Sequence, residues 1–89
     1  MEIRISQTPN PNALKFVLSE RRFPAPLSFP NATAAAADEL AAQLFAVGGI
    51  YNVFMVQDFI TINKYPDTPW ESLAGQLERI IVAYFGNQP

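Results

Sequence analysis

Residues 50–64, IYNVFMVQDFITINK, contain two stretches rich in β-branched and aromatic residues, separated by a polar pair. Ile50 to Val56 and Phe59 to Lys64 predict two β-strands, and Gln57-Asp58 predicts a two-residue turn between them. Such a turn places position 55 opposite 60 and position 53 opposite 62, so one face of the hairpin is entirely apolar. The expected core face consists of Val53, Met55, Ile60 and Ile62.

The N-terminal part of the chain predicts a second pair of strands. Residues 2–6 alternate polar and apolar side chains, with Ile3 and Ile5 on one side, and residues 13–18 repeat this pattern. In the segment 7–12 between them, each proline restricts the backbone and the asparagine side chains favour turns. We therefore expect a short, stiff connection between these two strands.

The middle of the chain is the least regular. Glu20 to Asn31 contains three prolines, so it can form at most an edge strand. The next helix is expected to begin after Asp38, a good N-cap residue, and to end at Gly48-Gly49. Whether residues 34–37 add a helical turn before Asp38 stays open, because no large apolar side chain anchors them.

The C-terminal part predicts a long amphipathic helix. Thr68-Pro69-Trp70-Glu71 is typical of a helix start, and apolar residues then recur at spacings of three and four up to Gly86. The capping residues indicate a helix of about 17 residues. The predicted order is therefore β-β-α-β-β-α. We expect a single α+β domain over residues 1–89, a two-layer sandwich with both helices on one face of a mostly antiparallel sheet.

The composition excludes several classes of function. The 89 residues include no cysteine and no histidine, so the chain lacks thiolate and imidazole ligands and the usual nucleophile–base pairs of enzymes. The net charge of −2 argues against nucleic acid as a partner. Because the usual catalytic pairs are missing, we expect that the protein is not an enzyme. No long apolar run or cationic leader indicates a membrane span or a signal peptide, so we expect it to be cytoplasmic.

The sheet face opposite the helices is the main candidate for function. It is more apolar and aromatic than a solvated face requires. The strand alternation assigns to it Arg4, Lys15, Val17, Phe54, Phe59 and Thr61. Two interpretations stay open: either the segment 23–30 folds over this face and buries its aromatic residues, or the face docks a partner protein. Stacking of single-stranded bases is disfavoured by the acidic net charge.

Several segments together resemble a known family. They are Thr8 to Phe16 (TPNPNALKF), Leu44-Phe45 with Gly49-Ile50, Val53-Phe54, Asp58 to Lys64 (DFITINK), and Trp70 with Leu73. The chain resembles the N-terminal domain of Nfu/NifU-type iron–sulfur cluster scaffold proteins. This resemblance implies a compact α+β domain and a place in iron–sulfur cluster assembly. In the full-length scaffolds a separate C-terminal domain carries a Cys-x-x-Cys pair, and because this chain has no cysteine, the scaffold activity does not transfer to it.

We therefore expect a non-catalytic interaction or adaptor domain whose partners are proteins of iron–sulfur assembly, acting as a monomer or weak homodimer without a bound cofactor. The candidate partner-binding residues are Thr8, Asn10, Asn12, Lys15, Phe54, Asp58, Phe59, Thr61 and Lys64. The alternative is a weak iron or divalent-metal binder that uses carboxylates, suggested by Asp58 at an exposed turn, although its acidic residues are scattered along the sequence.

Overall fold

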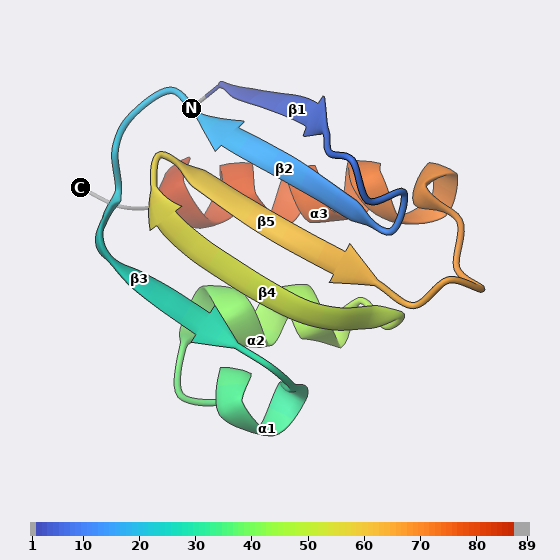
Figure 1. Ribbon diagram of the computed structural model, residues 1–89. Coiled ribbons are helices and arrows are strands. Elements are labelled where there is room, and N and C mark those ends of the chain that lie inside the picture. The colour runs from blue at the N-terminus through green and yellow to red at the C-terminus, as the bar shows by residue number, and fades with distance from the viewer. Residues whose placement is uncertain (1, 87–89) are drawn as a thin grey trace.

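The computed structural model describes residues 2–86 as one five-stranded antiparallel sheet with helices packed against one of its faces (Figure 1). The strand order across the sheet is β1-β2-β5-β4-β3. The elements are β1 (Ile3–Gln7), β2 (Ala13–Leu18), β3 (Phe23–Phe29), α1 (Ala32–Ala35), α2 (Glu39–Ala46), β4 (Ile50–Gln57), β5 (Phe59–Lys64) and α3 (Trp70–Gly86). Within these residues, no helix combines the length and apolar character needed to cross a membrane.

The predicted α+β class is confirmed, but the predicted element order was wrong in two places. The order is β-β-β-α-α-β-β-α, because the segment 23–29 forms an additional strand and the alanine-rich segment forms a short helix. β3 lies at the sheet edge and pairs only with β4, with an irregularity between Phe23 and Leu27. An edge strand tolerates Pro24 and Pro26 because their missing N–H groups cost little there. Asn31 caps α1 by accepting the Ala34 N–H at 2.8 Å.

The central hairpin has the predicted register. Val53 lies opposite Ile62, Met55 opposite Ile60, and the turn residues Gln57 and Asp58 separate the two strands. The four core-face side chains are at most 1% exposed. The predicted alternation is therefore confirmed, and it places the hairpin at the centre of the hydrophobic core.

The two longer helices supply the second layer of the core. Asp38 accepts the Ala41 N–H at 2.9 Å and so begins α2 where the sequence predicts, which directs Leu40 and Leu44 toward the sheet. α3 buries one residue per turn, namely Leu73, Leu77, Ile81 and Phe85. The spacing of four residues keeps these side chains on one stripe that faces the strands.

The connection from α2 to β4 depends on two glycines with left-handed backbone conformations. Gly48 has φ +92° and Gly49 has φ +77°, and a Cβ on Gly49 would lie 3.0 Å from the Thr68 hydroxyl oxygen. We expect Gly48→Ala to lower the free energy of unfolding by about 1–2 kcal/mol from backbone strain alone, and Gly49→Ala to lower it further because of the Thr68 contact. Urea unfolding of both variants measures this difference. Equal losses would show that Thr68 moves aside without cost.

Candidate functional site

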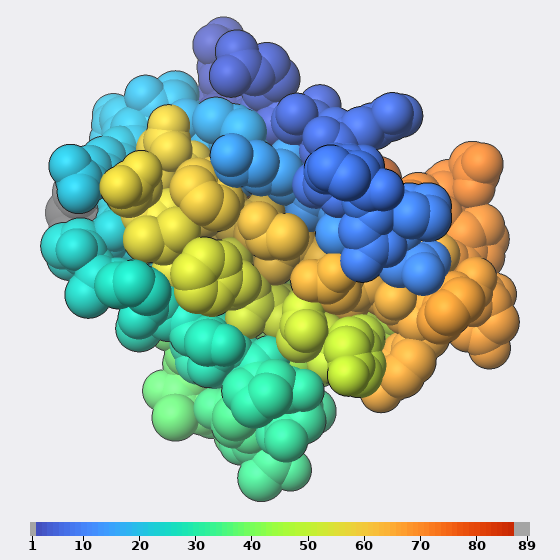
Figure 2. All heavy atoms as spheres, viewed as in Figure 1, coloured from blue at the N-terminus to red at the C-terminus, as the bar shows by residue number. Residues whose placement is uncertain are grey.

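One face of the sheet is left uncovered by the helices. We call this surface the outer face; it is the side seen in Figure 2, where β2, β5 and β4 lie next to one another. The register forms a row across four strands, in which Lys15 lies beside Thr61, Thr61 beside Phe54, and Phe54 beside Ser28. The paired positions of the outer face are Arg4, Ser6, Ala13, Lys15, Val17, Phe59, Thr61, Asn63, Asn52, Phe54, Val56 and Ser28.

Aromatic and cationic side chains lie together on the outer face. Phe54 is 37% exposed, and Phe59 is partly buried with the Lys15 ammonium 4.1 Å from the centre of its ring. Such a cation–π contact keeps the lysine stem close to the sheet while its charge stays in solvent. Among the paired positions of the outer face, Arg4 and Lys15 are the only charged residues, although the whole chain has a net charge of −2. The outer face is therefore cationic in an acidic protein.

The alternative in which segment 23–30 buries the outer face is wrong. β3 extends the sheet beside β4 instead of crossing over it (Figure 1). Its terminal residues Phe23 and Phe29 enter the core on the helix side, where they are 7% and 8% exposed. Main-chain pairing with β4 fixes the strand in the plane of the sheet, so it cannot cover Phe54 or Phe59.

The loop residues Thr8, Asn10 and Asn12, predicted as partner contacts, make hydrogen bonds within the protein. The Thr8 hydroxyl lies 2.9 Å from the Asn10 carbonyl oxygen and accepts the Asn10 N–H at 3.1 Å. The Asn10 side chain in turn accepts the Asn12 N–H at 2.9 Å. These contacts stiffen the loop between β1 and β2, as its prolines predict.

The structure places Lys64 on the helix side of the sheet, away from the outer face. Lys64 is 8% exposed, and its ammonium donates to the Asn12 side-chain oxygen at 3.0 Å. The Lys64 main-chain N–H also donates to the Asn12 carbonyl at 2.8 Å, and the Trp70 indole N–H donates to the Pro11 carbonyl at 3.0 Å. We call Pro11, Asn12, Lys64 and Trp70 the clasp. It joins the first loop, the end of β5 and the start of α3.

The clasp joins three of the segments that carry the resemblance, although they lie far apart in the sequence. The TPNPN segment, the lysine of the DFITINK segment and Trp70 satisfy one another's polar groups. A lysine this deeply buried is costly unless its ammonium has a hydrogen-bond acceptor. Asn12, Lys64 and Trp70 therefore have a structural role in this fold.

Sequence reasoning missed two exposed tyrosines at the end of the central hairpin opposite the turn. Tyr51 is 53% exposed and Tyr65 is 49% exposed, and their rings form an edge-to-face pair with centroids 5.4 Å apart. The register shifts between Ile50 and Asn52, so Tyr51 departs from the simple alternation of β4. A bulge leaves no clear signal in the sequence, which is why the alternation did not assign Tyr51 to a face.

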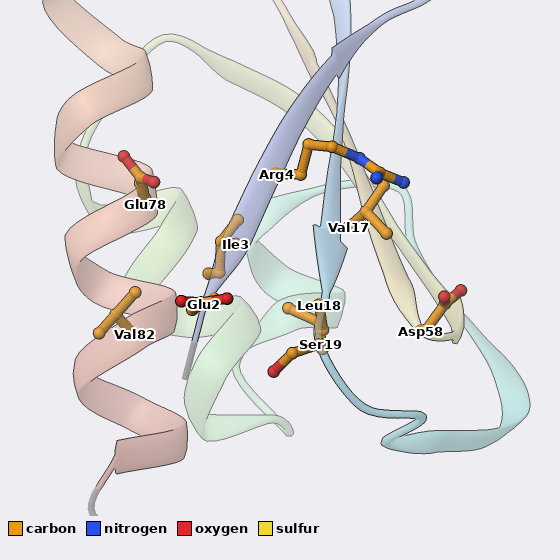
Figure 3. Close-up of a pocket in the computed structure, with 9 residues that line it drawn as sticks. All are labelled: Glu2, Ile3, Arg4, Val17, Leu18, Ser19, Asp58, Glu78 and Val82. Carbon is orange, nitrogen blue, oxygen red and sulfur yellow. The ribbon is translucent and has the colours of Figure 1, made fainter.

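Asp58 lies at one end of an open groove of about 700 Å³ beside β1 (Figure 3). The Asp58 main-chain carbonyl accepts the Leu18 N–H at 2.6 Å, which holds the hairpin tip against the end of β2. The groove also contains Glu2 and Glu78, but within residues 2–86 no three acidic side chains converge as a metal site requires. With no cysteine or histidine in the chain, the donor set does not fit an iron–sulfur cluster held by thiolates.

Comparisons with known proteins agree with the resemblance found in the sequence. Residues 3–88 match the family described as "Scaffold protein Nfu/NifU N terminal". The human protein named "NFU1 iron-sulfur cluster scaffold homolog, mitochondrial" is 36% identical over 92 residues, which covers 98% of this chain and 35% of the human protein. The chain therefore spans about a third of the length of the curated relatives it matches.

Two solved structures have the same fold. A crystal structure of protein SAV1430 from Staphylococcus aureus shares 30% identity with a TM-score of 0.74, covering 91% of this chain and 99% of that one. The solution structure of a NifU-like protein from Saccharomyces cerevisiae shares 26% identity with a TM-score of 0.83, covering 96% of this chain and 78% of that one. The family match and these structures, together with the fold, show that the chain belongs to the family of Nfu/NifU scaffold protein N-terminal domains, and it does so without a thiolate ligand of its own.

Proposed function

We propose that this chain is a non-catalytic protein-interaction domain associated with iron–sulfur cluster assembly, and that its partner protein docks on the outer face. The observation that carries this proposal is an uncovered sheet face with an exposed Phe54, a partly buried Phe59 and only positive charges at its paired positions, in a chain of net charge −2. The association with cluster assembly rests on the family and on the names of the relatives.

The chemistry of the outer face indicates an acidic partner. Phe54 and Phe59 supply the apolar area that anchors protein interfaces, and both are held on strands whose backbone is already ordered. An ordered surface loses little conformational entropy on binding. Arg4 and Lys15 at the same face favour a partner that brings carboxylates, because complementary charge accelerates association and selects the partner.

A non-catalytic role is consistent with the residues available. The chain contains serines and carboxylates, but no histidine or cysteine that could activate a nucleophile or act as one. The family to which the chain belongs is described as a scaffold-protein domain, not as an enzyme.

The proposal predicts that Phe59→Ala weakens binding of the chain to an iron–sulfur assembly protein of the same organism by about 30-fold, the effect of losing an interface hot spot. Titration calorimetry with the purified assembly proteins measures this change. Leu27→Ala is the matched control, because Leu27 is 39% exposed but lies in register with Met55, which points to the helix side.

The charge contribution is tested separately. Lys15→Glu should slow association and reduce the dependence of the association rate on salt, because it removes the attraction to an acidic partner. If a partner binds Phe59→Ala, Lys15→Glu and the unchanged protein equally well, with all three folded by NMR, the outer face is not the docking surface.

A further inference from the structure

The two edges of the sheet differ in whether they can pair with a further strand, and the outer-face proposal involves neither edge. At one edge, β3 contains Pro24 and Pro26 and an irregular register, features that prevent another strand from pairing with it. At the other edge, β1 contains no proline and has a regular register with β2 over its whole length. Within residues 2–86, nothing pairs with the free side of β1. The main-chain groups along this edge are available to an added strand.

The helix side of β1 is an incompletely covered part of the core. Ile3 and Ile5 lie opposite Leu18 and Phe16, which are 4% and 0% exposed. Ile5 itself is 37% exposed, because the helix layer that covers β2 does not extend fully over the edge strand. A sixth strand beside β1 would bury Ile5 in the way that β1 buries its neighbours on β2.

The groove between β1 and α3 shows what such a strand must carry. Figure 3 shows this groove, with Glu2 just before β1, Ile3 on β1, and Glu78 and Val82 on α3. Its lining combines apolar side chains with three carboxylates, those of Glu2, Asp58 and Glu78, against the single cation Arg4. The Arg4 side chain points toward Val17, on the side of β1 away from Glu78 (Figure 3). Side chains of an added strand that point toward the helices would therefore meet an apolar and acidic surface.

We propose that the free edge of β1 binds an extended segment of a partner protein by strand addition, and that the inward side chains of this segment combine apolar and basic residues. The apolar residue covers Ile5, and the basic residue lies near Glu2 and Glu78. A second copy of the chain fits less well, because it would bring the same carboxylates to its own groove. This surface is separate from the outer face, so the two proposals can fail independently.

The test uses the full chain labelled with ¹⁵N and a synthetic peptide in which threonine alternates with valine and lysine. We expect chemical-shift changes at β1, Glu78 and Val82, and slower hydrogen exchange of the β1 amides. Glu78→Gln should weaken binding about two- to fivefold, as the loss of a charge pair near the surface does. Glu71→Gln, an exposed glutamate in the first turn of the same helix, is the matched control and should bind as the unchanged protein does.

A lysine at an inward edge position opposes strand addition, so Ile5→Lys should abolish peptide binding while the rest of the spectrum stays folded. Phe59→Ala should leave peptide binding unchanged, which separates this site from the outer face. Equal binding of a peptide with glutamate in place of lysine, or shifts confined to the outer face, would overturn the proposal. A dimer by light scattering whose β1 amides exchange slowly without peptide would show that a second copy occupies this edge, and would also overturn the proposal.

Discussion

Replacing Phe16 with alanine is expected to lower the free energy of unfolding by about 3–5 kcal/mol. Phe16 is fully buried on β2, where it lies opposite Ile5 on one neighbouring strand and Ile60 on the other. Truncation of the ring leaves a cavity that the sheet cannot close, because main-chain pairing on both sides fixes the position of β2. A small domain has only about 5–15 kcal/mol of stability in total. The variant should therefore unfold at a much lower urea concentration.

Urea unfolding followed by circular dichroism measures this loss. Val17→Ala is the matched control, because Val17 is the next residue of the same strand but points to the outer face and is only partly buried. Its expected loss is about 1 kcal/mol or less, since most of its neighbours on that face are solvent. Similar losses for the two variants would mean that the two faces of β2 contribute equally, in conflict with the layer arrangement.

The second large loss of stability is expected when the indole of Trp70 is removed from the clasp. Trp70→Ala should lower the free energy of unfolding by about 2–3 kcal/mol, less than for a fully buried tryptophan because Trp70 is partly exposed. The change removes the hydrogen bond to the Pro11 carbonyl and the ring near which the Lys64 ammonium lies, 5.7 Å from its centre. Loss of these contacts should also free the loop that holds Asn12.

Trp70→Phe separates the ring from its hydrogen bond. It keeps most of the apolar area and loses only the indole N–H, so the expected cost is about 1 kcal/mol. Thermal unfolding followed by circular dichroism gives the two losses, and hydrogen exchange of the Lys64 amide, which donates to the Asn12 carbonyl, reports the state of the loop. An unchanged Lys64 exchange rate in Trp70→Ala would show that the loop is held without the tryptophan.

The elements predicted most accurately are those whose signal is local. The hairpin register follows from alternation over residues 50–64, and α2 begins after its predicted cap, Asp38. β3 was predicted only as a possible edge strand, since prolines lower the propensity of a segment wherever it lies. It forms a strand because β4 offers an unpaired edge and because Phe23 and Phe29 gain burial in the core.

In the candidate site too, local patterns predict some features, whereas others depend on contacts between distant segments. Alternation correctly placed Phe54, Phe59, Thr61 and Lys15 on one face of the sheet. Lys64 was interpreted as a surface cation, because lysine is seldom buried. Its acceptor, Asn12, lies 52 positions away in the sequence, so no local pattern indicates that the ammonium is satisfied inside the protein.

The sequence by itself determined the class of fold, the central hairpin, the starts of the two longer helices and the absence of any thiolate or imidazole ligand. Only the tertiary structure decided that β3 extends the sheet and leaves Phe54 exposed, that the clasp buries Lys64, and that β1 keeps a free edge. The physical reason is the range of the interactions. Alternation and capping act between residues a few positions apart, whereas coverage of a face or an edge depends on which distant segments pack against it.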